Sequence, residues 1–161
     1  MNMEIKIKYL DPNVPKLVHI GGQEKSNWID VYAARFEIDD NPVWNEMLDD
    51  CSLYIEPGHI IRVFLGFAME LPLGYEAHIA PRGSTFRKYG LVQTNSVGVV
   101  DSSYCGDTDE WFIPFYSLES GIIARYDRIA QFRIMETMPT VKFKPVDSLV
   151  NASRGGYGST G

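Results

Sequence analysis

The chain has 161 residues, 45% of them hydrophobic, and a formal net charge of −6. This length suits one domain with a buried core, and the composition excludes a disordered protein. The negative charge argues against a general nucleic-acid partner, because binding a nucleic-acid backbone needs a basic face. A protein with this charge that binds a polyanion must gather its cations locally or bring in a metal.

The cysteine and hydropathy patterns narrow the class of protein further. Cys51 and Cys105 are too few and too far apart in the sequence for a zinc framework or a disulfide scaffold, and no CxxC pair occurs. Two reduced thiols favour a cytoplasmic protein. Residues 4–10 alternate polar and apolar side chains, which predicts a half-buried strand rather than a signal peptide. No apolar run is long enough to span a bilayer, so we expect no membrane partner.

Short strands separated by turn signals make up most of the chain. Residues 41–48 combine a cap, a proline and apolar spacing that predict about two helical turns, inside a segment (39–51) to which we assign no chemistry. Pro114 predicts an edge strand or a bulge. The whole pattern indicates an all-β sandwich or jelly roll with one or two short helices. Strand patterns occupy residues 26–32, 53–56, 60–70, 75–80, 111–116, 125–135 and 141–150.

A short helix is predicted at residues 85–89. Gly83 and Ser84 precede it, and Gly90 is suited to end it in the left-handed conformation. The start of a helix offers unpaired N–H groups to an anion, and Arg82 adds a guanidinium fork. This segment is therefore a candidate phosphate-binding loop.

The next segment reads as a hairpin followed by a polar loop. Residues 91–100 place β-forming side chains around turn residues, among them Asn95, and the tip of a hairpin can read a flat heterocycle with its backbone. Asp101 and Tyr104 follow, and the acidic side chains within residues 107–110 fit a solvated loop. Cations, hydroxyls, a turn and one carboxylate in one stretch suit a site that holds a phosphorylated nucleoside and aims a water at it.

Five segments resemble, in order, the five motifs of the trimeric dUTPases (deoxyuridine triphosphate nucleotidohydrolases), above all the Bacillus and phage branch. The resemblance implies a jelly-roll or β-clip barrel that forms a homotrimer with active sites shared between subunits. It also implies a β domain (residues 1–150) and a flexible Gly- and Ser-rich lid (151–161). The segments are DVYAA (30–34), PRGS (81–84), GVVDSSYCG (98–106), DRIAQ (127–131) and GGYGSTG (155–161).

The reaction that the resemblance implies is hydrolysis of dUTP to dUMP and pyrophosphate with Mg²⁺ as cofactor. Asp101 would activate the water that attacks the α-phosphorus in line, and Asp30 would lie near the metal and phosphate end of the site. Asn95 would read uracil, Tyr104 would lie under the deoxyribose and Tyr157 would stack on the base. The remaining substrate contacts would come from Arg82, Gly83, Ser84, Gly98, Val99, Val100, Gln131, Arg154, Gly158, Ser159 and Thr160.

Some positions depart from the family pattern, and two alternatives stay open. Gly83 stands where serine is usual, Tyr126 where glycine is usual, and Arg154 lies closer than usual to the aromatic residue. Asp127 and Arg128 are expected mainly to fix a turn, by pairing with each other or with a neighbour.

The first alternative function, a dCTP deaminase-like relative, needs a glutamate that residues 111–116 do not offer. The second is a regulatory protein of this fold that binds protein partners.

Overall fold

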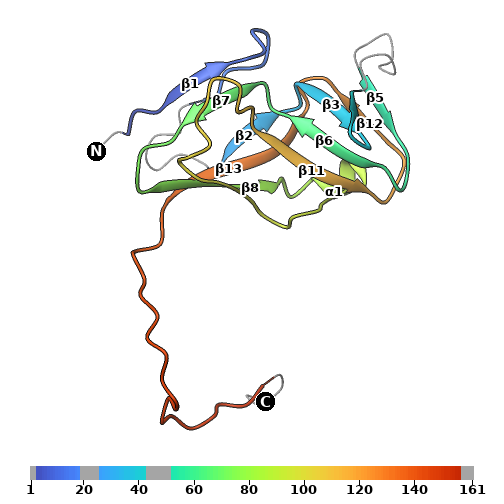
Figure 1. The fold of residues 1–161 in the computed structure, drawn as a ribbon. Helices are drawn as coiled ribbons and strands as arrows, with labels where there is room; N and C mark the ends of the chain where they lie inside the picture. Colours follow the sequence, from blue (N-terminus) through green and yellow to red (C-terminus); the bar gives the residue numbers. More distant parts are fainter. Residues whose placement is uncertain (1–2, 19–25, 43–51, 157–161) are drawn as a thin grey trace.

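The computed structural model describes residues 3–18, 26–42 and 52–156 (Figure 1). Within these ranges nearly all regular structure is strand, with one short helix, which confirms the all-β prediction. No helix in the described ranges is long or apolar enough to cross a bilayer. The predicted helical turns at residues 41–48 are contradicted at their start, because Asn41 and Pro42 pair with β3 as a strand. Residues 43–48 lie outside the described residues, as do Cys51, Tyr157 and residues 158–161.

The strands are short and antiparallel throughout. The first half of the chain contains β1 (Lys6–Tyr9), β2 (Ile29–Tyr32), β3 (Arg35–Ile38), β4 (Asn41–Pro42), β5 (Ser52–Ile55), β6 (Ile60–Phe64) and β7 (Phe67–Glu70). The second half contains β8 (Tyr75–Pro81), α1 (Thr85–Tyr89), β9 (Leu91–Gln93), β10 (Gly98–Val100), β11 (Phe112–Ser117), β12 (Gly121–Ala124) and β13 (Arg128–Glu136).

Two larger sheets carry the fold. One has the strand order β10-β8-β13-β2, the other β4-β3-β6-β11-β9, and the pairs β1-β7 and β12-β5 complete the body. Neighbouring strands are mostly distant in sequence, so the order of the chain does not reveal which motifs share a sheet. The ribbon in Figure 1 shows these sheets packed into one body, which the chain leaves after β13.

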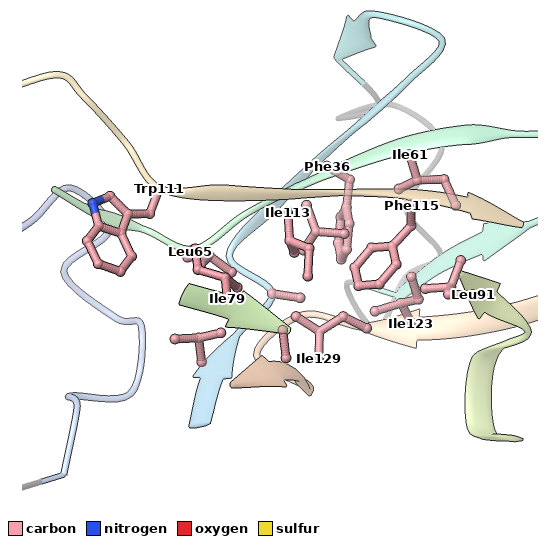
Figure 2. Packing of buried hydrophobic residues seen from close by; sticks show 14 of the residues in the cluster. Phe36, Ile61, Leu65, Ile79, Leu91, Trp111, Ile113, Phe115, Ile123 and Ile129 are labelled. Carbon is pink, nitrogen blue, oxygen red and sulfur yellow. The ribbon is translucent and has the colours of Figure 1, made fainter. Parts of the chain in front are cut away.

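One hydrophobic core lies between the two larger sheets. Ile113 and Phe115 of β11 point toward Ile129 of β13, and all three are buried (Figure 2). Trp111, just before β11, packs its ring against that of Phe132 with centroids 5.3 Å apart. Burying each such side chain contributes about 1.5–3 kcal/mol. The core therefore fixes the positions of β8, β11 and β13; Arg82 directly follows β8, and Gln131 lies on β13.

The predicted strand at residues 60–70 is two strands in different sheets. The chain breaks at Gly66, whose φ of +76° favours glycine. A Cβ added there would lie 2.9 Å from Cβ of Ala34, so the close approach of two chain segments also requires glycine. The strand formers on both sides of Gly66 hide the break, although a glycine inside a strand pattern is itself a signal of one.

The prediction that Pro114 marks an edge or a bulge is wrong, because β11 lies between β6 and β9. The carbonyl oxygen of Pro114 accepts a hydrogen bond from the N–H of Thr94 at 3.1 Å. Thr94 directly follows the last residue of β9, so the missing N–H of proline falls where pairing with β9 ends. An interior strand tolerates proline at such a position.

The predicted strand at residues 141–150 is absent; this described segment is an extended arm that leaves the body (Figure 1). A strand needs a neighbouring strand for its backbone N–H and C=O groups, and in the described part of the chain no strand pairs with residues 141–150. Its apolar side chains remain exposed, with Phe143 at 87% and Leu149 at 78%. We name residues 137–150 the arm.

Candidate functional site

Six of the predicted site residues line one cavity of about 250 Å³, the Asp101 cavity. It lies beside β10, at the edge of the four-stranded sheet. The other wall comes from residues at the start of β11. The lining residues are Ile79, Asn95, Gly98, Val99, Val100, Asp101, Tyr104, Trp111, Phe112 and Pro114.

The predicted hairpin at residues 91–100 is wrong in its pairing, although the turn exists. β9 pairs with β11 and β10 pairs with β8, so the chain crosses from one sheet to the other between them. Ser96 has a φ of +58° in this crossing. Asn95 and Gly98 line the Asp101 cavity on the two sides of Ser96. The cavity thus lies where the two sheets meet.

Asp101 is exposed and accepts its hydrogen bonds from the loop that follows it. Its Oδ1 accepts from the backbone N–H of Ser103 at 2.7 Å and also from the Ser103 hydroxyl. These hydrogen bonds, led by that of the hydroxyl, hold the pKa of the Asp101 carboxyl below its ordinary value of 3.8. Asp101 is therefore a carboxylate at neutral pH, and the bonds to Oδ1 leave Oδ2 to meet a ligand or water.

Tyr104 closes the same loop. Its hydroxyl donates to the carbonyl oxygen of Glu110 at 3.1 Å, and its N–H donates to the carbonyl of Asp101 at 3.2 Å. Burial raises the pKa of Tyr104, and the charges of Asp109 and Glu110 raise it further. The ring is therefore a neutral, fixed surface at the cavity.

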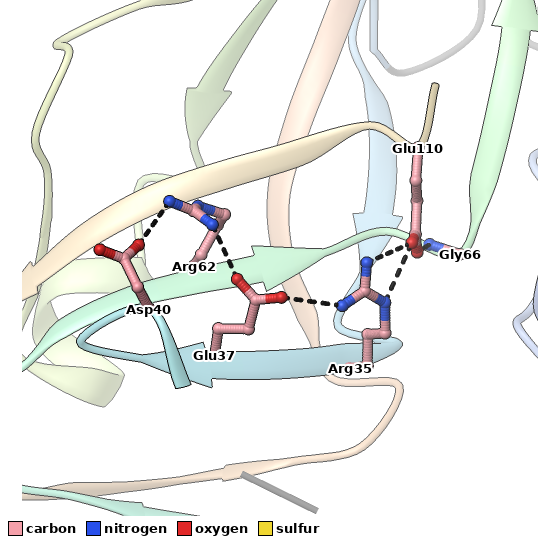
Figure 3. Close-up of polar contacts among 6 residues, drawn as sticks. All are labelled: Arg35, Glu37, Asp40, Arg62, Gly66 and Glu110. Atoms are coloured by element: carbon pink, nitrogen blue, oxygen red, sulfur yellow. Dashed lines mark hydrogen bonds and ion pairs between the residues drawn. The ribbon is translucent and has the colours of Figure 1, made fainter. Parts of the chain in front are cut away.

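The expectation of a solvated acidic loop fails for Glu110, whose side chain is only 12% exposed. Its Oε2 accepts from Nε and Nη2 of Arg35 at 3.0 and 2.7 Å, and its Oε1 accepts from the N–H of Gly66 at 3.0 Å (Figure 3). Glu110 thus ties the loop that carries Asp101 to β3 and to the Gly66 break. A side chain that follows two acidic neighbours, Asp107 and Asp109, gives no sequence signal of such pairing.

Charged side chains continue from Arg35 across the outer face of β3 and β6 (Figure 3). Glu37 accepts from Arg35 at 3.3 Å and from Arg62 at 2.7 Å. The Arg62 guanidinium lies over the ring of Phe112, 5.4 Å from its centroid. Because Phe112 lines the Asp101 cavity, this network braces one of its walls.

A second cavity of about 390 Å³, the Arg82 cavity, is lined by two of the predicted phosphate-binding side chains, Arg82 and Gln131, and by Asp30. Arg82 donates through Nε to Oδ1 of Asp30 at 2.8 Å, and Nη1 of Arg128 lies 3.5 Å from Oδ2 of Asp30. Gln131, the register partner of Asp30, donates to the carbonyl of Pro81 at 3.3 Å. The lining residues are Val18, Ser26, Trp28, Ile29, Asp30, Tyr32, Arg82, Arg128 and Gln131.

The loop from Arg82 to α1 is held by Thr85, which the sequence interpretation had placed only at the helix start. The Thr85 hydroxyl accepts from the N–H of Arg82 and donates to the carbonyl of Ile129, both at 2.9 Å. The N–H of Thr85 donates to the carbonyl of Arg82 at 2.9 Å. This N–H is therefore not free to bind an anion, contrary to the expectation for the start of the helix. Gly83 and Ser84 are exposed, and Gly90 ends α1 at φ +67° as predicted.

The turn before β13 confirms that Asp127 and Arg128 pair with neighbours rather than with each other. Asp127 Oδ2 accepts from the hydroxyl of Tyr89 at 2.7 Å and from the N–H of Ala124 at 3.1 Å. Tyr126, in the position where the resembled family has glycine, has a φ of +66°, and its hydroxyl donates to Asp11 at 2.9 Å. The side-chain bond offsets the cost of a left-handed tyrosine.

The two cavities share no lining residue, and Arg154 lines neither. Arg154 is exposed beyond the arm (Figure 1). The remaining predicted lid residues, Tyr157, Gly158, Ser159 and Thr160, lie outside the described residues. Within a single chain, the residues predicted to bind the base and the water therefore lie in a different cavity from Arg82 and Gln131, which are predicted to bind phosphate.

Comparison with known proteins identifies similar chains. The family model described as dUTPase matches residues 50–161. The SPbeta prophage-derived deoxyuridine 5′-triphosphate nucleotidohydrolase YosS of Bacillus subtilis is 46% identical over 159 residues, which cover 99% of each chain.

Solved structures of phage proteins share the fold. The dUTPase of Staphylococcus bacteriophage 80alpha with dUPNHPP superposes with a TM-score of 0.71 at 20% identity and covers 99% of each chain; its description states that phage dUTPases control transfer of virulence genes. A mutant dUTPase from phage phi11 of S. aureus, described with a structural Mg(II) ion, has a TM-score of 0.66 at 15% identity, covering 91% of this chain and 99% of that one.

Proposed function

The chain belongs to the dUTPase family, and from that premise we propose how its residues carry out the reaction. It is a deoxyuridine 5′-triphosphate nucleotidohydrolase of the jelly-roll fold, which hydrolyses dUTP to dUMP and pyrophosphate. The observation that carries the assignment of roles is the Asp101 cavity, which gathers one ionised carboxylate, one tyrosine ring and the backbone of β10.

Asp101 orients a water molecule and accepts its proton as the water oxygen attacks the α-phosphorus. The bond from that phosphorus to the bridging oxygen breaks, and pyrophosphate leaves on the side opposite the water. A carboxylate with a lowered pKa is a weak base, so its fixed position supplies most of the effect. The hydrogen bonds from Ser103 supply that fixed position.

Base and sugar bind in the same cavity. Asn95 and the backbone of Gly98, Val99 and Val100 read uracil, and the Tyr104 ring lies under the deoxyribose. Support comes from the cavity volume of about 250 Å³ and from its partly apolar wall at Phe112 and Pro114.

The triphosphate binds to Arg82, Gly83, Ser84 and Gln131, whose side chains and backbone surround the Arg82 cavity or its adjoining loop. Because the two cavities share no residue, one chain alone does not assemble the site. We place the Arg82 cavity of one subunit against the Asp101 cavity of its neighbour in a homotrimer. The arm, with its exposed apolar side chains, supports this assembly because a second copy would bury them.

The segment 151–161 acts as a lid over the shared site. Arg154 contributes a guanidinium, and Gly158, Ser159 and Thr160 contribute N–H and hydroxyl donors to the phosphates. Tyr157 stacks on the base. Support comes from the arm, which carries the chain away from its own body before the lid begins (Figure 1).

Mg²⁺ fits this chain as an ion held mainly by the substrate phosphates. The described residues contain no cluster of three or more His, Cys, Asp or Glu side chains that could hold a metal. Asp30 is already paired with Arg82 and Arg128, which suits a place beside the ion rather than in contact with it. When bound, Mg²⁺ spreads the negative charge that develops on the phosphates.

The direct test is pyrophosphate release from dUTP by Asp101→Asn. Loss of the base should lower turnover by about 10²–10⁴-fold while binding of a non-hydrolysable dUTP analogue is retained. The matched control is Asp107→Asn, an exposed carboxylate in the same loop that pairs with Lys8 at 3.1 Å. Turnover that survives in the Asp101 variant, or falls equally in the control, would contradict the assignment.

Two further points complete the proposal. β11 contains no acidic residue, so a deaminase role finds no second base there, and an assay of ammonia release from dCTP tests it.

A regulatory protein partner is proposed from the fold shared with the phage 80alpha protein. Pull-down with and without a non-hydrolysable dUTP analogue tests for such a partner. We place the enzyme in the cytoplasm, where deoxynucleotides are used.

A further inference from the structure

Gln93 is a buried amide where the chain crosses from one sheet to the other. It is the last residue of β9, and only 5% of it is exposed. Its Nε2 donates to the carbonyl oxygen of Ile79 at 3.2 Å and to Oδ1 of Asn95 at 2.7 Å. Ile79 belongs to β8, so one side chain joins both sheets to a residue that lines the Asp101 cavity.

The orientation of this amide is fixed by the backbone. If the Gln93 amide were reversed, its oxygen would face the carbonyl oxygen of Ile79, and two acceptors would repel each other. In the observed orientation, Oε1 of Gln93 has no hydrogen-bond partner among the described residues. A buried acceptor without a partner is unfavourable. The two bonds of Nε2 therefore outweigh that cost.

The Gln93 amide also fixes the orientation of the Asn95 amide through their hydrogen bond. Asn95 lines the cavity, and its Oδ1 already accepts from Gln93, so we infer that the group left to meet a ligand is its Nδ2, a donor. A donor matches the carbonyl oxygen at position 4 of uracil and not the amino group that cytosine carries there. If the Asn95 amide were reversed, its oxygen would face the cavity, and the site would prefer cytosine over uracil.

Gly98 packs beside the Gln93 amide. A Cβ added to Gly98 would lie 3.5 Å from Nε2 of Gln93 and 3.3 Å from Cβ of Ile79. Gly98 is also the register partner of Ile79 in the pairing of β10 with β8. The Ile79 carbonyl, the Gln93 amide and the Asn95 amide thus form one compact series beside β10.

We propose that Gln93 is a positioning residue that sets the amide of Asn95 to select uracil over cytosine. The inference rests on the proposed function of the Asp101 cavity and deepens it. Gln93 does not itself line the cavity, so it acts through Asn95 and not on the substrate.

The test measures discrimination between the two bases in two Gln93 variants of the full chain. Gln93→Leu keeps the approximate size, and it removes both the donor and the unpaired oxygen, so the fold is retained. Asn95 can then turn its oxygen to the cavity. The ratio of kcat/KM for dUTP to that for dCTP should fall about tenfold, which corresponds to about 1.4 kcal/mol.

Gln93→Glu is the sharper variant, studied at alkaline pH to keep its carboxylate ionised. A carboxylate accepts from Nδ2 of Asn95, which turns Oδ1 toward the cavity, so dCTP should gain more than in the leucine variant. The control is Ser117→Ala, which removes a buried hydrogen bond to the carbonyl of Glu119, at 2.7 Å, away from the cavity. The control should keep the wild-type ratio.

Calorimetric binding of dUMP and dCMP to the same proteins gives a readout that does not depend on turnover. An unchanged preference for dUMP in the leucine variant overturns the role of Gln93, whether or not the glutamate variant folds. Wild-type protein that leaves dUTP intact would instead contradict the proposed function. A loss of stability with an unchanged ratio would assign Gln93 to the fold alone.

Discussion

Arg82 and Asp30 are joined by a hydrogen bond in which Nε of the guanidinium donates to Oδ1 of the carboxylate at 2.8 Å. The bond uses one edge of the guanidinium and leaves its terminal nitrogens to bind phosphate. Both side chains are about 70% buried, since 28% and 29% of them are exposed, so solvent screens the pair only in part. The carboxylate thus orients the phosphate-binding fork.

Replacement of Arg82 by lysine tests this orientation without changing charge. A lysine ammonium offers neither the Nε bond to Asp30 nor a bidentate fork. KM for dUTP should rise about tenfold or more, because charge-assisted bidentate bonds contribute about 1.5–3 kcal/mol. The control is Arg125→Lys, an arginine that pairs with Asp11 at 2.9 Å and lines neither cavity. Equal effects of both substitutions in steady-state kinetics would mean that the fork has no special role.

Removal of the Ser103 hydroxyl should shift the pH profile of the enzyme. The active form of Asp101 is the carboxylate, and a pKa below 3.8 keeps it ionised to lower pH. Ser103→Ala removes the largest cause of that lowering, so the pKa rises toward 3.8 and the acid limb of kcat/KM moves to higher pH. Steady-state kinetics across acidic pH, with folding monitored by circular dichroism, measures the shift. An acid limb that stays in place or moves lower would contradict this role of Ser103.

Gly83→Ser should be neutral or beneficial for activity. No atom lies within 4 Å of a Cβ added at Gly83, and the resembled family places a hydroxyl donor here. The contrasting variant is Gly90→Ser, where φ is +67° and an added Cβ would meet Cβ of Glu119 at 2.6 Å. That second variant should lower the melting temperature. A large loss of activity in Gly83→Ser would mean that the loop has another arrangement with substrate bound.

Removal of residues 153–161 should spare the fold and the proposed trimer but lower kcat/KM by at least about tenfold, because the proposed lid would position the phosphates and exclude bulk water. Sedimentation and circular dichroism check assembly and fold, and pyrophosphate release checks the rate. A chain that carries the same residues in scrambled order is the control for length and composition. Loss of the trimer on truncation would show that this segment has an assembly role.

Local features of the fold were predictable because they depend on neighbouring residues. Gly90 ends α1 as expected, since only its own φ matters. The crossing between β9 and β10 was not predictable, because turn residues such as Ser96 suit a hairpin equally well. Pairing with distant strands decided the outcome. The predicted strand at residues 141–150 did not form for the same reason: its pattern fits a strand, but none of the described strands pairs with it.

The candidate site was likewise predictable where it depends on local motifs and unpredictable where it depends on contacts between distant residues. Asp101 and Arg82 were found because motifs carry them, yet their place in two cavities depends on the sheet order. Glu110 was missed because its partner Arg35 is distant in sequence. Gln93 left one sequence signal that was not used: it alternates with Leu91 on the buried face of β9, where a polar side chain needs a reason.

The separation of the two cavities has a genetic consequence. A mutant defective in the Asp101 cavity and another defective in the Arg82 cavity would each be inactive alone. Co-expressed, they would form mixed trimers in which an intact Asp101 cavity from one allele faces an intact Arg82 cavity from the other. Two null alleles would then complement each other, whereas the same lesions carried on one polypeptide would not.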